Sequence, residues 1–393
     1  MKAVHFGIGN IGRGLIGLVL HRGGYEITFC DVSSALVDAM NAAGSYTVHE
    51  AGVGGAVSVV TGFRALDSGM DPDTVAAEIA TADVVTTAVG PTVLSRIAPL
   101  VVAGLRRRDP ARPPLQVMAC ENAIGATDLL KSEIARLAGG DATTFRAVFA
   151  NTAIDRLVPT QPSRDGVDVT VEPFFEWAVE RAPFGDDPPV LPGAHLVDDL
   201  APFIQRKLYT VNTGHATAAY LGFRAGFETV PEALADPQIA RVVATAMEET
   251  SAVLARRHGL DAVELAEYRT TALRRLADPA IPADTVARVG RQPMRKLSRH
   301  ERFIGPAALA AEWGLPVEAL LTGIGAALAF DVPADAQAVE LRALLQTRDA
   351  GELTSILTGL DGSHPLFAAV RALIVDRQAS SVRGRMPSRA IRA

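Results

Sequence analysis

Three side chains that could handle a proton and a hydroxyl group stand close together near the middle of the chain. They are Lys207, Asn212 and His215. On a helix, at about 100° per residue, Asn212 lies about 140° and His215 about 80° round from Lys207, so all three project into one broad sector. Small and apolar residues border that sector, which indicates partial burial. Burial lowers the pKa of a lysine and makes it usable as a base near neutral pH.

Each of these residues also has an ordinary structural explanation. A lysine early in a helix is usually on the surface, a histidine on an apolar face is usually a satisfied core group, and an asparagine is often a helix cap. Taken singly, each residue is better explained in that way. Together they could deprotonate and orient an alcohol, provided that the chain also binds a redox cofactor.

A second group of charged residues follows in the segment 288–296. A glycine and a proline within it interrupt the helical pattern. Guanidinium forks and an ammonium group suit a phosphate or a polyol. A solvated basic loop explains the same spacing equally well. The cations of this segment are Arg288, Arg291, Arg295 and Lys296.

The N-terminus has the pattern of a dinucleotide site. A short apolar strand, 2–6, runs into a glycine-rich turn and a helix, and a second strand, 26–30, ends at Asp31. In such a site Gly7 allows the tight turn, Gly9 lets the backbone approach the pyrophosphate, and Gly12 lets the helix pack closely. The phosphates bind at the helix N-terminus, and the acid binds the adenosine ribose. The three residues after Asp31 are Val32, Ser33 and Ser34, so no adjacent arginine could hold a ribose phosphate, which favours NAD over NADP.

Two further strands should end beside the same site. The apolar stretch 82–89 breaks at a glycine and a proline, and the stretch 115–120 ends at Glu121 and Asn122. In a doubly wound sheet the ligand lies outside the carboxyl ends of the strands, although a plain strand-to-helix turn explains each side chain alone equally well. The predicted NAD contacts are Gly7, Gly9, Asn10, Ile11, Gly12, Asp31, Ala88, Val89 and Gly90.

The length of 393 residues favours two domains. Strands and helices alternate as far as the proline- and glycine-rich stretch 183–193, and the periodicity from 200 to 374 is almost entirely helical. We therefore predict an α/β protein, with an N-terminal Rossmann-type sheet domain over 1–190 and a mostly α-helical domain over 191–376. The arginine-rich segment 377–393 is expected to be a flexible basic tail.

Composition excludes several classes of protein. The net charge of −6 provides no general basic field for nucleic acid or an anionic membrane. Two cysteines make a disulfide scaffold or a four-ligand zinc site improbable. No apolar run is long enough to cross a membrane, and the N-terminus enters a core strand directly, without a signal peptide. A protein of the reducing cytoplasm is expected.

The sequence resembles the polyol-specific long-chain dehydrogenases over nearly its whole length, more weakly past about residue 375. The spacing of the lysine, asparagine and histidine is the most specific feature. The stretches that carry the resemblance are 5–14, 86–91, 119–122, 155–156, 207–215 and 288–296.

The resemblance implies roles for the residues of these stretches. Lys207 matches the family's general base, Asn122 and Asn212 match the pair that polarises the reacting oxygen, and His215 matches the histidine that binds substrate and orients the lysine. The implied substrate contacts are Asp155, Arg288, Arg291, Arg295 and Lys296, of which Arg291 and Arg295 resemble positions of a phosphate-using branch. The family uses no metal, and its precedent favours a monomer.

The expected reaction is the reversible, NAD-dependent and metal-independent oxidation of D-mannitol 1-phosphate to D-fructose 6-phosphate, with a lysine as general base. One alternative is a related dehydrogenase that acts on an unphosphorylated polyol or a hexuronate. A second is a non-catalytic NAD-binding regulator. The lysine motif argues against the regulator, because a sensor needs no base.

Overall fold

The structure is a computed structural model that describes residues 1–52, 55–139, 145–157, 166–279, 281 and 284–383. The chain divides into two compact units. The first comprises Met1–Ile204 with residues 280–282, and the second comprises Gln205–Pro279 with residues 283–393. We call them the sheet unit and the helical unit and describe each by itself.

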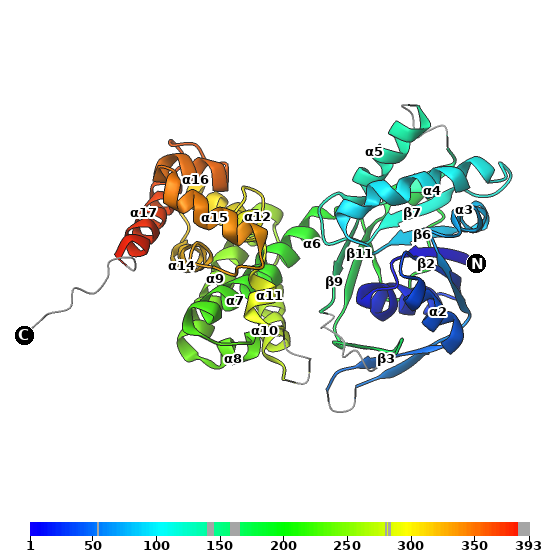
Figure 1. The fold of residues 1–393 in the computed structure, drawn as a ribbon, viewed down its shortest axis with the longest axis horizontal. Helices are drawn as coiled ribbons and strands as arrows, with labels where there is room; N and C mark the ends of the chain where they lie inside the picture. The colour runs from blue at the N-terminus through cyan, green and yellow to red at the C-terminus, as the bar shows by residue number, and fades with distance from the viewer. Residues whose placement is uncertain (53–54, 140–144, 158–165, 280, 282–283, 384–393) are drawn as a thin grey trace, which may run out of the picture. The chain divides into compact units, whose positions relative to one another are not determined.

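A six-stranded sheet of parallel strands forms the centre of the sheet unit (Figure 1). The strand order is β5-β2-β1-β6-β7-β8, so the chain reverses its direction of travel across the sheet between β1 and β6. Ligands of doubly wound sheets bind at such a switch point. The strands are β1 (Lys2–Phe6), β2 (Glu26–Asp31), β5 (Phe63–Asp67), β6 (Val84–Thr87), β7 (Leu115–Ala119) and β8 (Ala147–Phe149).

Helices cover both faces of this sheet because its strands are apolar on both sides. On β1, Val4 and Phe6 belong to the core beneath α3, α4 and α5, whereas Ala3 belongs to the opposite core. That opposite core packs beneath η1, α1 and α2. The helices are η1 (Gly12–Gly17), α1 (Leu18–Arg22), α2 (Ser34–Ala43), α3 (Pro72–Thr81), η2 (Pro91–Val93), α4 (Leu94–Arg107), α5 (Ala126–Ala138) and η4 (Ala182–Phe184).

Two small three-stranded sheets complete the sheet unit. Their orders are β10-β3-β4 and β12-β11-β9, and Trp177 of β11 is fully buried in the same core as η1. The strands are β3 (Tyr46–Glu50), β4 (Val57–Val60), β9 (Thr152–Asp155), β10 (Val169–Val171), β11 (Glu176–Glu180) and β12 (His195–Val197).

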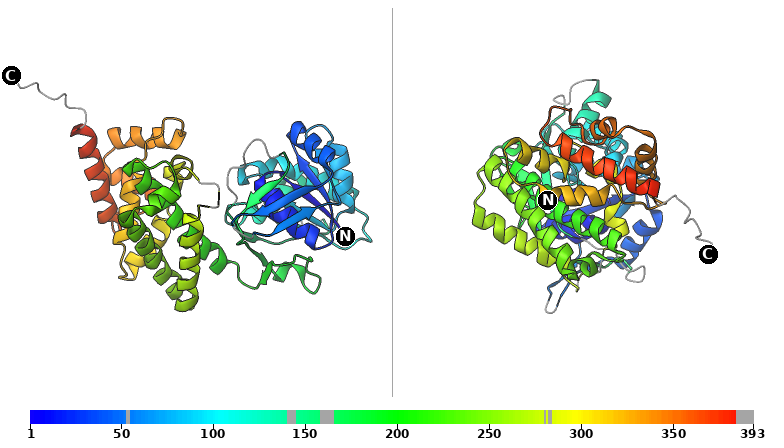
Figure 2. Two further views of the ribbon diagram at one scale, coloured as in Figure 1. Left: turned by 90° about the horizontal axis from the view of Figure 1, so that it is seen from below. Right: turned by 90° about the vertical axis from the view of Figure 1, so that its left-hand side faces the viewer.

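The second unit is helical throughout its described elements, and α17 packs against α14 and α16 (Figure 2). α6 (Ala201–Arg206) leads into it from the sheet unit. Its elements are η5 (Lys207–Asn212), α7 (Thr213–Ala225), α8 (Val230–Ala235), α9 (Pro237–His258), α10 (Ala262–Ala277), α11 (Val286–Gly290), α12 (Pro293–Lys296), α13 (Ile304–Glu312), α14 (Glu318–Ala327), α15 (Ala336–Thr347), α16 (Ala350–Thr358) and α17 (Phe367–Arg383).

The predicted fold class is confirmed, with a parallel Rossmann-type sheet followed by a mostly helical part. Some elements differ from expectation. The strand β5, for example, was not predicted. The helix α17 enters the segment expected to be a flexible tail, and the rest of that segment, 384–393, lies outside the described residues.

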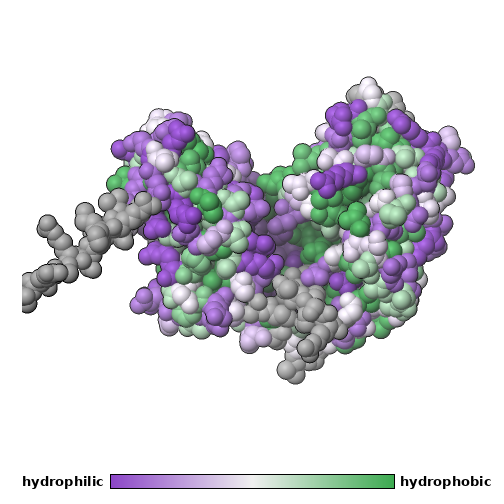
Figure 3. Space-filling model, viewed as in Figure 1, coloured by the Kyte–Doolittle hydropathy of each residue, from purple (hydrophilic) through white to green (hydrophobic). Residues whose placement is uncertain are grey.

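The surface of both units mixes polar and apolar residues on the face shown in Figure 3. Among the described residues, no helix combines the length and the apolar character that a membrane span requires.

Candidate active site

The turn after β1 lies against the segment that follows β6. Gly7 has a φ of 104°, and a Cβ atom at this position would lie 2.5 Å from the carbonyl oxygen of Ala88. A Cβ at Gly12 would lie 1.9 Å from the carbonyl oxygen of Gly7. Both positions therefore require glycine. At Gly9 a Cβ would meet no atom within 4 Å, so the outer side of the turn is open at the start of η1.

Asp31, at the end of β2, is hydrogen-bonded to the backbone of this turn. Its carboxylate accepts hydrogen bonds from the backbone N–H groups of Ile8 at 2.8 Å and Ser33 at 3.0 Å. Asn10 accepts a weak hydrogen bond from the guanidinium of Arg13 at 3.4 Å, and Ile11 packs partly buried against the core. The predicted cofactor residues thus gather at the carboxyl ends of β1, β2 and β6.

Glu121 is a buried acid that the sequence did not predict as part of the site. It is 7% exposed, and its Oε1 accepts hydrogen bonds from the Thr87 hydroxyl at 2.6 Å and the Val89 N–H at 3.0 Å. Its Oε2 accepts from the Gly90 N–H at 2.7 Å. One carboxylate therefore fixes the segment after β6. The next residue, Asn122, is exposed at the same edge of the sheet.

Asp155 is buried in β9, outside the parallel sheet. Its neighbour Arg156 is also buried and donates to the carbonyl oxygens of Glu172, at 2.7 and 3.0 Å, and of Gly14 at 2.9 Å. Burial lowers the pKa of Arg156 to about 10. The contact with Gly14 ties this segment to η1, which begins at the glycine turn.

In the helical unit, Lys207 begins a π-helical turn that ends at Asn212. Hydrogen bonding from i to i+5 in such a turn places residues five apart on one side of the helix, and π turns occur frequently at functional sites. The angle around the helix axis between Lys207 and Asn212 is therefore smaller than the offset of about 140° that a regular α-helix would give.

Other residues of this helix are packed into the core. Val211, Gly214 and Ala216 are buried, whereas Asn212 and His215 are partly exposed. A Cβ at Gly214 would lie 2.7 Å from the sulfur of Met247 on α9, so a larger residue here would require the Met247 side chain to move. Packing against α9 thus leaves the polar side of the motif accessible.

His215 faces a carboxylate that was not predicted, that of Asp284. The His215 Nε2 atom lies 3.8 Å from Asp284 Oδ2, and the Nε atom of Arg288 donates to Asp284 Oδ1 at 2.5 Å. Burial lowers the pKa of His215 to about 4. The nearby charges of Arg302, Arg288 and Lys296 also lower this pKa, whereas that of Asp284 raises it. His215, Arg288 and Lys296 are therefore brought into one cluster.

Lys296 is the last residue of the 288–296 segment, which we call the basic segment, and its side chain is buried. Its ammonium donates to the carbonyl oxygens of Val289, at 2.7 Å, and Arg291. Burial, together with Arg302 and Arg295, lowers the pKa of Lys296 to about 7. These contacts hold the backbone of the 288–296 segment from within.

Arg291 and Arg295 lie on the exposed side of that segment. Arg295 pairs with Glu301 at 2.7 Å and donates to the side-chain oxygen of Gln292 at 2.9 Å. Gln292 has a φ of 59°, which makes it the one non-glycine among the described residues with a positive φ. Its N–H donates to Asp335 at 2.9 Å, and such strain tends to occur at functional sites.

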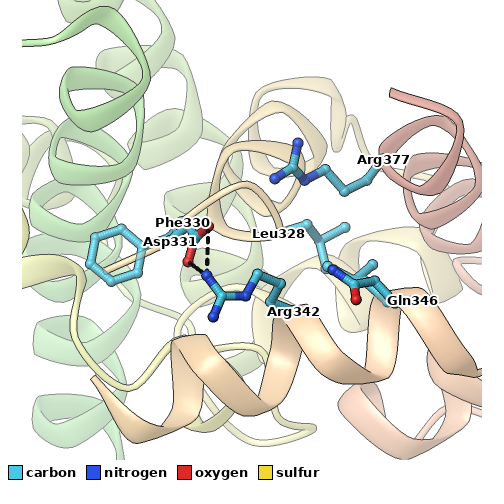
Figure 4. A pocket seen from close by; sticks show the side chains of 7 residues that line it. Leu328, Phe330, Asp331, Arg342, Gln346 and Arg377 are labelled. Carbon is cyan, nitrogen blue, oxygen red and sulfur yellow. Dashed lines mark hydrogen bonds and ion pairs between the residues drawn. The ribbon is translucent and has the colours of Figure 1, made fainter. Parts of the chain in front are cut away.

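A separate pocket lies within the helical unit (Figure 4). Arg342 pairs there with Asp331 at 2.9 Å, and Leu328 and Phe330 supply apolar wall. Its free volume of about 20 Å³ suits a water molecule and not a sugar. We do not include it in the site.

A parallel sheet with a glycine turn at its switch point, followed by a helical unit with an accessible lysine, asparagine and histidine, defines a two-domain Rossmann-type oxidoreductase. The chain belongs to the mannitol dehydrogenase family. Residues 1–193 match the model of the mannitol dehydrogenase Rossmann domain, and residues 199–355 match that of the mannitol dehydrogenase C-terminal domain. The expected membership of the polyol-specific dehydrogenases is confirmed.

Similar proteins span nearly the whole chain. Mannitol-1-phosphate 5-dehydrogenase of Arthrobacter sp. (strain FB24) is 54% identical over 381 residues, which cover 96% of this chain and 99% of that protein. The enzyme of the same name from Neosartorya fischeri is 46% identical over 386 residues, which cover 97% and 99%.

Two solved structures share the fold. Pseudomonas fluorescens mannitol 2-dehydrogenase, in a ternary complex with NAD and D-mannitol, superposes with a TM-score of 0.78 at 17% identity, covering 98% of this chain and 92% of that chain. A substrate-free D-sorbitol dehydrogenase gives a TM-score of 0.78 at 18% identity, covering 97% and 93%.

Proposed function

We propose that the protein interconverts D-mannitol 1-phosphate and D-fructose 6-phosphate with NAD as the redox partner. Relatives 46–54% identical bear the name mannitol-1-phosphate 5-dehydrogenase. The observation that carries the proposal is the π turn that begins at Lys207 and ends at Asn212, beside the accessible His215. A base and hydrogen-bonding groups on one side of a helix suit proton transfer from an alcohol.

The glycine turn would hold the cofactor. The open space at Gly9 fits a pyrophosphate close to the backbone, at the start of a helix where N–H groups attract anions. Asp31 would bind the adenosine ribose, and its charge would repel the extra phosphate of NADP. Gly7, Asn10, Ile11 and Gly12 would form the turn around the pyrophosphate, and the backbone of 88–90 would border the nicotinamide. When bound, NAD supplies the hydride acceptor, and NADH the donor.

Residues of the protein would transfer the proton of the reacting hydroxyl group and stabilise the negative charge that develops on its oxygen. Lys207, when neutral, takes the proton of the C5 hydroxyl group during oxidation and returns it during reduction. Asn122 and Asn212 donate hydrogen bonds to the oxygen as it becomes negative. Preorganised donors of this kind are worth about 3 kcal/mol each. His215 binds the substrate and helps to orient Lys207.

The basic segment would bind the phosphate end of the substrate. Arg291 and Arg295 are the exposed guanidinium groups, and Arg288 and Asp155 would contact the polyol chain. Lys296 would act from beneath by holding the backbone of this segment.

An assay of NADH consumption tests the proposal directly. The full-length protein should oxidise NADH with D-fructose 6-phosphate, and with D-fructose the kcat/KM should be at least about a hundredfold lower, since two charge-assisted hydrogen bonds to phosphate would be missing. Failure to oxidise NADH with any ketose or hexuronate, despite measurable NADH binding, would favour the non-catalytic regulator.

An unphosphorylated substrate is the second candidate, because Glu301 already pairs with Arg295. The double variant Arg291→Ala with Arg295→Ala should raise the KM for fructose 6-phosphate about tenfold to a hundredfold and leave the weak activity on fructose unchanged. Arg342→Ala, which removes another exposed pair of the helical unit, is the matched control. Equal effects on both sugars would rule out a phosphate role for the two arginines.

A further inference from the structure

Asp284 joins two residues of the proposed site. One carboxylate oxygen accepts from Arg288 at 2.5 Å, and the other lies 3.8 Å from the Nε2 atom of His215. Its side chain is 20% exposed, and that of His215 is 17% exposed. At 3.8 Å the carboxylate acts on the imidazole through its field or through a bridging water.

The surroundings of His215 decide its protonation. Three cations, Arg288, Lys296 and Arg302, lie near enough to disfavour a charged imidazole, and burial acts in the same direction. His215 is therefore neutral at pH 7. A neutral imidazole carries one N–H group and one lone pair, and a carboxylate attracts the N–H and repels the lone pair. The hydrogen therefore belongs on Nε2, next to Asp284, and the lone pair on Nδ1.

We propose that Asp284 is a positioning residue that holds His215 in the Nε2–H tautomer and fixes Arg288 with its other oxygen. His215 then offers Nδ1 as a hydrogen-bond acceptor to a hydroxyl group of the polyol or ketose. This inference deepens the proposed function and rests on it for the identity of the ligand. The tautomer itself is independent of turnover.

The specificity that follows is for a ligand with a hydroxyl donor at this position. A sugar phosphate that lacks the hydroxyl group facing His215 would leave the Nδ1 lone pair without a hydrogen-bond donor. Without Asp284 the ring could adopt either tautomer, and Arg288 would lose the contact that orients it. Binding of the sugar would weaken, whereas the cofactor contacts proposed in the sheet unit would be unchanged.

Nuclear magnetic resonance of the full-length protein, labelled with ¹⁵N in its histidine rings, tests the tautomer. Long-range ¹H–¹⁵N correlations at pH 7.5 should show the Nε2–H pattern for His215, whose signals are identified by their loss in His215→Asn. Asp284→Ala should give a mixture of tautomers. A wild-type His215 with hydrogen on Nδ1, or a doubly protonated ring, overturns the proposal even if no Asp284 variant folds.

Kinetics test the positioning role. Asp284→Ala should raise the KM for fructose 6-phosphate about tenfold, the loss of roughly one oriented hydrogen bond, and leave the KM for NADH unchanged. Asp284→Asn retains the size of the side chain and should be intermediate. The matched control Arg288→Ala should raise the sugar KM with the His215 tautomer intact.

An unchanged sugar KM in Asp284→Ala would overturn the positioning role. A wild-type protein that shows the expected tautomer and no turnover with any sugar would contradict the proposed function instead. The two failures are therefore distinguishable.

Discussion

Gly9 and Gly12 lie in the same turn, but their surroundings differ. Gly9→Ala should leave the melting temperature nearly unchanged, because a Cβ there meets no protein atom within 4 Å, and should weaken NADH binding by filling the space proposed for the pyrophosphate. Gly12→Ala should destabilise the sheet unit, because its Cβ would collide with the Gly7 carbonyl oxygen. Fluorescence titration with NADH and thermal unfolding separate the two effects. Undiminished NADH binding in Gly9→Ala would remove the turn from the cofactor site.

His5 makes the stability of the sheet unit depend on pH. The ring is fully buried between strands, with Nδ1 2.7 Å from the Thr86 hydroxyl, and burial lowers its pKa to about 3. In the unfolded chain a histidine has a pKa of about 6.5. Between these values only the unfolded state takes up the proton, so the stabilisation is present above about pH 6.5 and is lost as the pH falls.

Lowering the pH from 7.5 to 5.5 should therefore decrease the free energy of unfolding by about 1 kcal/mol through this residue. His5→Gln, which does not titrate, should remove that part of the pH dependence. Urea unfolding in a Trp313→Phe background, where buried Trp177 reports on the sheet unit, provides the measurement. Parallel pH dependences in the two proteins would contradict the assignment.

At the residue scale, sequence alone could predict groups whose spacing is local. Lys207, Asn212 and His215 lie within nine positions, so their common face follows from helical periodicity. Asp284 reaches His215 only through the packing of distant segments, and no local pattern marks it. Glu121 gave a weak signal, an acid at the end of a buried strand, but its partners come from another strand.

At the scale of elements, the helix α9 has strong local end signals. It begins at Pro237 after Asp236 caps its first N–H groups, and it ends before Gly259, which adopts a left-handed conformation. The π turns could not be predicted, because they arise from packing. In η1, a Cβ at Gly17 would lie 2.4 Å from the Tyr46 hydroxyl.

Glu121 provides a prediction about the segment between β6 and η2. Glu121→Gln replaces one acceptor oxygen by an NH2 group, which would face the N–H of Val89 or Gly90 as a second donor. We expect NADH binding to weaken about tenfold, the effect of roughly one lost buried hydrogen bond. Glu133→Gln on α5, whose carboxylate pairs with Arg136 at the surface, is the matched control and should change little. Equal NADH affinities in the two variants would contradict a role for Glu121 in shaping the cofactor site.

At the scale of the whole molecule, the sequence predicted the succession of a sheet part and a helical part from a change in periodicity. It could not supply the strand order, because the parallel pairs join segments far apart in the chain. β5 was missed because it is short and only partly buried. It completes one edge of the sheet beside β2, the strand that ends at Asp31.

The helical unit contains two lysines that could serve as a base. Lys296 has a pKa of about 7, but its ammonium is buried and donates to backbone carbonyl oxygens of its own loop. Lys207 begins the π turn, on the accessible side of its helix. We therefore propose that Lys207 transfers the proton and that Lys296 supports the 288–296 segment.

Turnover of Lys207→Ala, compared with Lys296→Ala, is the most direct test of this account. With fructose 6-phosphate and NADH, Lys207→Ala should lower kcat by about a hundredfold to ten-thousandfold, the usual contribution of a positioned base, while NADH binding stays near the wild-type value. Lys296→Ala should act mainly on the KM for the sugar. Near-normal kcat in Lys207→Ala, with turnover lost in Lys296→Ala, would contradict the central claim.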